Sequence, residues 1–186
     1  MAKENKTKYA LLGVLSLGPA SGYDIKKYCD VSIAHFWNEN YGHIYPVLRQ
    51  LEEEGLVDRQ TEMSEGKARH VYHMTEKGRT ALHDWLSLPS ESPPTRYEFL
   101  LKMYFSSEIP TSVVTERLVE SKVFCGKLIE TYQCIADHMR QAMENNPACR
   151  HKTRFQLATV LYGIRDVQAK IAWCEDCLTM LKEEMP

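Results

Sequence analysis

The stretch YGHIYPVLRQLEEEGLVDRQTEMSEGKARHVYHMTEKG, residues Tyr41 to Gly78, decides the fold of this chain. Its first part spaces apolar residues three or four apart, the period of an amphipathic helix, and Gly55 is a natural C-terminal cap for that helix. Two runs with strand composition follow, Leu56 to Met63 and Arg69 to Met74, around a Ser-Glu-Gly turn. A short helix followed by a hairpin predicts a recognition helix and a wing, which together place a helix in a DNA groove and a hairpin beside it.

Two helices are predicted before this stretch, and they support the recognition helix. The first has an apolar face of three leucines, Leu11, Leu12 and Leu15. Gly18-Pro19 stops it. The second begins at Ser21, which forms a capping-box arrangement with Asp24, and its apolar pattern runs to Phe36.

The third helix carries the side chains that would read DNA. Because Pro46 has no N–H and is tolerated in a first turn, we expect this helix to begin near Gly42 to Tyr45. Its outward positions are His43, Tyr45, Arg49, Gln50 and Glu53. The N-terminal half of this face holds no carboxylate, whereas Glu52 to Glu54 lie at the far end. Since phosphates repel carboxylates and favour the positive end of a helix dipole, this polarity suits a helix docked by its N-terminus.

Basic residues flank the predicted wing tip at Lys67 and Arg69. Each feature also has a plainer interpretation. Tyr45 could be a core aromatic, and Arg49 could pair only with a nearby glutamate. Lys67 and Arg69 could simply keep a hairpin edge from pairing with neighbours. Taken together, three helices, a carboxylate-free helix start and a basic wing favour DNA binding.

These residues also fall into motifs, which are Ser21-Gly22-Tyr23-Asp24-Ile25, Gly42-His43-Ile44-Tyr45-Pro46-Val47-Leu48, Leu51-Glu52-Glu53-Glu54-Gly55-Leu56, Gly66-Lys67-Ala68-Arg69 and Tyr72-His73-Met74-Thr75-Glu76-Lys77-Gly78. Together they resemble the PadR family of winged-helix transcription regulators. The resemblance implies that the helix with Tyr45 and Arg49 enters the major groove, while the wing grips the backbone or minor groove. His43 stands where the family usually has a small hydroxyl residue. The DNA contacts predicted in this way are His43, Tyr45, Arg49, Gln50, Lys67 and Arg69.

After residue 88 the composition changes. Prolines and serines indicate a short stiff linker at residues 89–94, between a winged-helix domain at 1–88 and a helical domain at 95–186. Two long heptad-patterned helices follow, separated by Asn145-Asn146-Pro147. The seam residues expected to dimerise are Leu118, Cys125, Leu128, Tyr132, Ile164, Ile171, Cys174 and Leu178. Each helix carries more apolar residues than one seam uses, so a second copy of the chain would cover the rest and form a homodimer.

The segment Arg96 to Lys102, followed by two long helices, is similar to the longer PadR subgroup, whose C-terminal domain resembles that of virulence-gene activators. This similarity implies a helical dimerisation domain and a palindromic operator with half-sites about 34 Å apart. It also implies a small aromatic or lipophilic effector bound between the winged helix and the dimer helices. Trp173, Tyr132, Tyr104 and Phe105 are candidates to line that pocket, although aromatic residues at helical spacing are more often plain core.

Composition restricts which classes of protein this chain can belong to. Basic residues number 11 in residues 1–88 and 12 thereafter, against 12 and 13 acidic ones, so DNA affinity must come from a local patch. No apolar run reaches the roughly 18 residues of a membrane helix, and six irregularly spaced cysteines fit reduced thiols in the cytoplasm. The near-neutral charge leaves open an alternative, a winged-helix scaffold that binds proteins instead of DNA.

The sequence does not predict catalytic activity for this chain. Cys174-Glu175-Asp176-Cys177 is a C-x-x-C, but it falls in mid-helix with two carboxylates inside it, which disfavours a thiolate. Cys134 and His138 supply only two ligands for a metal. There is no P-loop and no G-x-G-x-x-G. We therefore expect no cofactor and no enzyme activity. The predicted fold is mainly α, an α+β winged helix-turn-helix plus a C-terminal helical dimerisation domain. The predicted function is that of a homodimeric repressor on double-stranded DNA.

Overall fold

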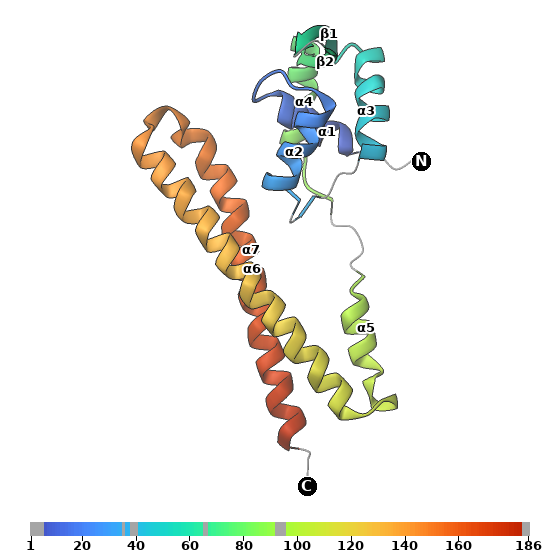
Figure 1. Ribbon diagram of the computed structural model, residues 1–186, viewed down its shortest axis with the longest axis vertical. Helices are drawn as coiled ribbons and strands as arrows, with labels where there is room; N and C mark the ends of the chain where they lie inside the picture. The colour runs from blue at the N-terminus through green and yellow to red at the C-terminus, as the bar shows by residue number, and fades with distance from the viewer. Residues whose placement is uncertain (1–5, 35, 38–40, 65–66, 92–95, 184–186) are drawn as a thin grey trace. The chain divides into compact units, whose positions relative to one another are not determined.

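The computed structural model describes residues 6–34, 36–37, 41–64, 67–91 and 96–183. The chain divides into two compact units, Met1–Pro93 and Pro94–Pro186. The first contains α1 (Thr7–Leu15), α2 (Gly22–Ser32), α3 (Tyr41–Glu53), β1 (Val57–Ser64), β2 (Lys67–Met74) and α4 (Glu76–Ser87), labelled in Figure 1. The second contains α5 (Glu98–Tyr104), the 3-10 turn η1 (Ser106–Glu108), α6 (Thr111–Asn145), the 3-10 turn η2 (Pro147–Cys149) and α7 (Arg150–Glu183).

These elements confirm the predicted mainly α fold with one small hairpin. The linker expected at residues 89–94 lies partly outside the described residues. Among the helices that the structure describes, none is long and apolar enough to cross a membrane.

The recognition helix α3 starts earlier than predicted. It begins at Tyr41 instead of between Gly42 and Tyr45, so Pro46 lies in its second turn. Because Pro46 has no N–H, the helix forgoes the bond to the Gly42 carbonyl four residues back. The end of the helix is as predicted, since Gly55 takes the left-handed conformation with a φ of 68°.

Helix α2 starts as predicted and ends early. Its N-cap Ser21 accepts a hydrogen bond from the Asp24 N–H, and the Asp24 carboxylate accepts one from the Ser21 N–H, so the capping box is complete. The helix ends at Ser32, where turns replace the regular ladder. Phe36, which the apolar pattern placed on the buried face, therefore lies beyond the helix and is 53% exposed.

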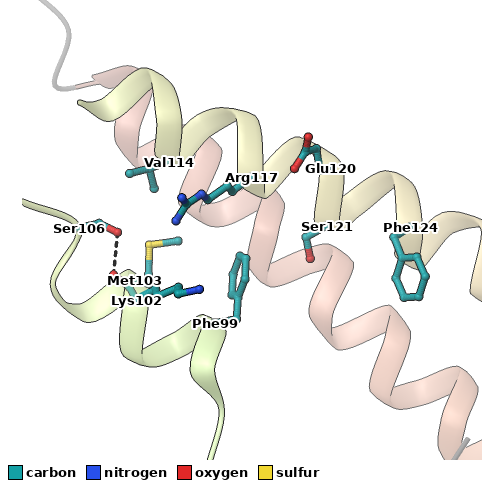
Figure 2. Close-up of a pocket in the computed structure, with 9 residues that line it drawn as sticks. All are labelled: Phe99, Lys102, Met103, Ser106, Val114, Arg117, Glu120, Ser121 and Phe124. Atoms are coloured by element: carbon teal, nitrogen blue, oxygen red, sulfur yellow. Dashed lines mark hydrogen bonds between the residues drawn. The ribbon is translucent and has the colours of Figure 1, made fainter. Parts of the chain in front are cut away.

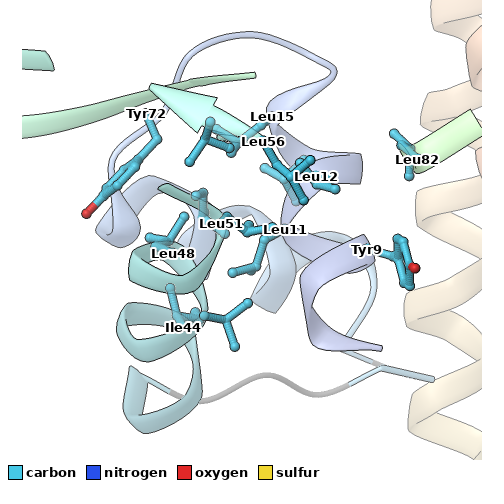
Figure 3. Packing of buried hydrophobic residues seen from close by; sticks show 14 of the residues in the cluster. Tyr9, Leu11, Leu12, Leu15, Ile44, Leu48, Leu51, Leu56, Tyr72 and Leu82 are labelled. Carbon is cyan, nitrogen blue, oxygen red and sulfur yellow. The ribbon is translucent and has the colours of Figure 1, made fainter. Parts of the chain in front are cut away.

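The core of the first unit forms where α3 packs on α1. Figure 3 shows Ile44, Leu48 and Leu51 of α3 directed toward Leu11 of α1. All four side chains are fully buried. Burial of a side chain of this size contributes about 1.5–3 kcal/mol, so the core fixes the inward face of α3 and leaves the opposite face to solvent.

Polar contacts connect the end of α3 to the start of α4. The Thr75 hydroxyl caps α4 by accepting from the Gly78 N–H at 3.1 Å and donates to the Gly55 carbonyl at 2.9 Å. The Lys77 ammonium donates to the Glu54 carbonyl at 2.7 Å, where a cation suits the negative end of the α3 dipole. The two ends of the predicted wing are therefore held together at its base.

The wing itself is an antiparallel pair of β1 and β2. Its register runs from Val57 opposite Met74 to Ser64 opposite Lys67, and the two residues between the strands, 65 and 66, lie outside the described part of the chain. A two-stranded hairpin is marginal alone. Here Tyr72 exchanges two backbone hydrogen bonds with Ala20, at 2.9 and 3.2 Å, which attaches β2 to the residue before the α2 cap.

In the second unit, α6 and α7 pack along each other as an antiparallel hairpin (Figure 1). The residues predicted to dimerise all pack inside this hairpin: Leu118, Cys125, Leu128, Tyr132, Ile164, Ile171, Cys174 and Leu178. Within one chain, the seam of each helix meets the seam of the other helix. The role of these residues in dimerisation stays a prediction, and exposed apolar side chains also lie outside the seam.

The close approach of Gly78 to Leu56 predicts how a substitution there would change stability. A Cβ on Gly78 would lie 2.1 Å from the Leu56 carbonyl oxygen, which is a backbone atom that cannot move aside cheaply. We expect Gly78→Ala to destabilise the first unit by about 1–3 kcal/mol, the usual cost of an inserted group that forces the backbone to shift. Thermal unfolding followed by circular dichroism measures this change.

The matched control is Gly13→Ala in α1, where an added Cβ meets nothing within 4 Å. Alanine is favoured over glycine inside a helix by about 0.5–1 kcal/mol, so this variant should unfold at the same or a higher temperature. Equal melting temperatures for the two variants would contradict the close contact at Gly78.

Candidate nucleic-acid interface

The face of α3 opposite the core is exposed and holds the predicted reading residues. His43, Tyr45, Arg49 and Gln50 all lie on it. The Gln50 amide donates to the Glu54 carboxylate at 2.6 Å, which orients it toward the C-terminal end of the helix. All four side chains are exposed on α3, and Tyr45 and Arg49 among them line one cavity.

Tyr45 is placed by the first residue of α2. Its ring packs so closely on Gly22 that a Cβ there would lie 2.7 Å from the ring carbon Cε1. The ring nevertheless remains 49% exposed. Tyr45 is therefore not a core aromatic, as the plainer interpretation had it. Its half-exposed ring packs against Gly22.

A cavity of about 500 Å³ opens where the start of α2, the exposed face of α3 and the wing meet. Its walls include Gly22, Tyr45, Arg49, Arg59, Arg69 and Tyr72. Glu52 also lines this cavity and pairs with Arg59, while Arg69 pairs with Asp24, so two of the three arginines have an acidic partner.

Arg69 turns from the wing toward α2. Its Nη2 donates to the Ser21 Oγ at 3.0 Å and also forms an ion pair with the Asp24 carboxylate. Arg69 therefore links the wing to the start of α2, and does more than place a charge at the edge of the hairpin. The backbone of Lys67 lies in β2, but its side chain lies outside the described part of the structure.

Arg59 was missed by the sequence reasoning. Its Nε lies 3.1 Å from the Glu52 Oε1, which ties β1 to the end of α3, and it stands opposite Tyr72 in the wing. Burial raises the pKa of Tyr72 above its ordinary value, while Arg59 acts in the opposite direction. Strand alternation could have found this residue, because Arg59 shares a face with buried Val57 and stands opposite Tyr72 in the register.

The four residues predicted to line an effector pocket lie in different surroundings. Trp173 lines a cavity of about 530 Å³ in the second unit and meets Phe99 edge-on at 5.7 Å. Tyr132 is buried in the hairpin against Gly163. Tyr104 is 82% exposed beside Phe105, with ring centroids 5.0 Å apart. Of these four residues, Trp173 alone lines this cavity, so the effector pocket predicted between the two units stays a prediction.

Next to that cavity, α5 packs on the start of α6. Figure 2 shows Met103 of α5 directed toward Val114 of α6, with Phe99 beside it. These residues surround a second hollow of about 400 Å³ that also includes Arg117 and Phe124. Phe99 lines both hollows.

None of the six cysteines, all of which the structure describes, forms a disulfide, and three of them are buried: Cys29, Cys125 and Cys174. Burial, followed by the neighbouring Cys174 and Asp176, raises the pKa of Cys177, which disfavours the thiolate form. Cys134 lies 3.6 Å from the His138 Nδ1 at the surface. Within the described ranges, no three His, Cys, Asp or Glu side chains gather in a way that could hold a metal ion.

A helical unit that exposes one face of its third helix beside a β-hairpin defines a winged helix-turn-helix protein. Residues 11–84 match the model of the transcriptional regulator PadR-like family, and residues 95–182 match that of the virulence activator alpha C-terminal domain. The chain is 40% identical over 183 residues to the negative transcriptional regulator PadR of Bacillus subtilis, covering 95% of this chain and 98% of that protein. It therefore belongs to the PadR family of transcriptional regulators, as its motifs predicted.

Solved structures agree with this membership. The crystal structure of Bacillus subtilis PadR in complex with operator DNA superposes with a TM-score of 0.84, at 27% identity over the superposed residues, and covers 96% of this chain and 99% of that one. The Vibrio cholerae virulence activator AphA superposes with a TM-score of 0.72 at 31% identity and covers 96% and 99%. Both similarities extend over the winged helix and the helical unit.

Proposed function

We propose that this protein is a homodimeric repressor that binds a palindromic operator in double-stranded DNA and is released by a small effector. The observation that carries the proposal is the exposed face of α3, which begins without a carboxylate and borders a cavity walled by three arginines. Its relative in Bacillus subtilis is named a negative regulator and was solved with operator DNA. We place the protein in the cytoplasm, where bacterial DNA is accessible, and assign it no catalytic activity.

In this proposal α3 enters the major groove with its N-terminal half leading. Arg49 is suited to bind a guanine edge with two hydrogen bonds, and the half-exposed Tyr45 ring offers apolar contact to bases. His43 lies at the leading end of the helix, where a phosphate would approach. Gln50 follows on the same face, and Lys67 on the wing would contact the backbone.

The DNA-binding prediction concerns Arg49. We expect Arg49→Ala to weaken binding by about 10- to 100-fold, since one bidentate base contact contributes about 1–3 kcal/mol. The probe is a fluorescent duplex selected from random DNA by the purified protein, and anisotropy titrations give the dissociation constant. For the unchanged protein, log affinity should fall with log salt by about 0.9 per phosphate neutralised.

The control is Arg165→Ala on α7, where the exposed guanidinium donates to Gln168 at 3.0 Å, and this variant should bind normally. An Arg49→Ala, Lys67→Ala variant with unchanged affinity would show that the wrong face has been assigned. If no duplex is selected even at low salt, the protein-interaction scaffold becomes the better description.

The dimer part of the proposal rests on apolar side chains outside the α6–α7 seam. Phe124 is 66% exposed on α6, in a unit where many other large apolar side chains are also uncovered. They include Leu101, Tyr104, Val119, Val123, Leu161 and Tyr162. A second copy of the chain, paired by two-fold symmetry, would cover those of them that lie around Phe124.

We therefore expect Phe124→Asp to weaken the dimer, because a charge would be buried against the partner without a counter-charge. Light scattering at micromolar concentration should report a lower mass, with the helical content kept. Thr131→Asp adds the same charge at an exposed polar position of α6 and should remain dimeric. A Phe124→Asp protein that stays fully dimeric would overturn this assignment of the interface.

The effector part rests on the cavity beside Trp173. Its volume of about 530 Å³ lies in the range of small-molecule sites. Tyr97, Phe99 and Leu128 provide apolar walls, while Lys170, paired with Asp166 at 2.5 Å, provides a polar group. Such a cavity suits a small aromatic molecule with one polar end. Bacillus subtilis PadR has been solved with p-coumaric acid.

The test uses p-coumaric acid as the probe. Added to the complex of protein and selected duplex, it should release the DNA. Trp173→Leu should raise the concentration required by up to about tenfold, since an aromatic contact contributes about 0.5–1.5 kcal/mol. Phe155→Leu changes an exposed ring elsewhere on α7 and should leave the response unchanged. An equal response in both variants would exclude this cavity as the effector site.

A further inference from the structure

Arg69 joins the capping box of α2 to form a network of three side chains. The Asp24 Oδ2 accepts from the Ser21 N–H at 3.1 Å and from the Ser21 hydroxyl at 2.9 Å. The Ser21 Oγ in turn accepts from the Asp24 N–H at 3.3 Å and from the Arg69 Nη2 at 3.0 Å. Arg69 also pairs directly with the Asp24 carboxylate. A residue of the wing is thus built into the start of a helix 45 positions earlier.

This network lies at the edge of the surface proposed to meet DNA. Ser21, the neighbouring Gly22 and Arg69 line the same cavity as Tyr45 and Arg49. Asp24 is about 40% exposed next to them, so its carboxylate would repel an approaching phosphate unless a cation cancelled its charge. The guanidinium of Arg69 supplies that cation.

The pair has little effect on global stability, because both side chains are about 40% exposed and exposed ion pairs contribute little. Its effect is local. A two-stranded wing depends on its attachments, and Arg69 attaches β2 to α2 next to the backbone bridge between Ala20 and Tyr72. Breaking the pair would free the wing edge and leave one carboxylate unpaired on the DNA side.

We propose that Arg69 is a positioning residue that acts on DNA through Asp24, by cancelling its charge and holding the wing, instead of binding a phosphate itself. This inference rests on the proposed DNA-binding function and reassigns one residue of the predicted contact set. A phosphate-binding arginine would instead act independently of Asp24, and its removal would lower the salt dependence.

The experiment is a double-mutant cycle with four full-length proteins: the unchanged chain, Arg69→Ala, Asp24→Asn and the double variant. Asparagine keeps an oxygen to accept from the Ser21 N–H, so the helix cap survives the change. Anisotropy with the selected duplex gives the affinity of each protein over a range of salt. Effects of residues that act as a unit are not additive in such a cycle.

We expect Arg69→Ala to weaken binding by about tenfold when Asp24 is present and by less than about twofold in the Asp24→Asn background. The salt slope of the double variant should equal that of the unchanged protein. An equal loss in both backgrounds, with the slope reduced by about 0.9 for each phosphate contact removed, would overturn the proposal and identify Arg69 as a phosphate ligand.

A second measurement needs no DNA and separates this inference from the proposed function. Amide hydrogen exchange in β2 should become faster in Arg69→Ala and in Asp24→Asn, and the double variant should resemble either single one. Unchanged exchange in β2 would show that the pair does not hold the wing, and would overturn that half of the proposal. Failure of the unchanged protein to bind any duplex would instead reject the DNA-binding function.

Discussion

The close contact of Gly78 with the Leu56 carbonyl determines how the reading surface is assembled. Leu56 follows the glycine that ends α3, and its carbonyl also accepts from the Thr75 N–H at 3.1 Å. The end of the recognition helix, the base of the wing and the start of α4 therefore meet at one backbone group. Gly78 has no side chain, and only such a residue leaves room for the Leu56 carbonyl at this distance. The direction of the wing relative to α3 follows from it.

Charge around the cavity is arranged in pairs more than as an open positive field. Arg59 is paired with Glu52, and Arg69 with Asp24. These pairs connect each strand of the wing to a different helix, β1 to α3 and β2 to α2. A nearly neutral chain cannot rely on long-range attraction, so its affinity must depend on a few correctly placed donors. The paired arginines hold the wing strands against the two helices.

Features that depend on residues close in sequence could be predicted, and those that depend on distant residues could not. The capping box of Ser21 with Asp24 and the helix end at Gly55 are local signals, and both are present. The pair of Arg69 with Asp24 joins positions 45 residues apart, which no spacing rule reveals. Because of Pro46, the start of α3 was predicted too late in the sequence. Tertiary packing of the inward face outweighs the one helix hydrogen bond that Pro46 cannot make.

The heptad pattern shows a different limit. It identifies which side chains need apolar partners, but not whether these partners come from the same chain. The seam residues are satisfied within one hairpin, and the exposed Phe124 lies one position before the seam residue Cys125 on α6. One helix therefore carries two adjacent sets of apolar side chains. The inner set packs the hairpin together, and in the proposed dimer the outer set would contact a second copy, so that two winged helices face a palindrome.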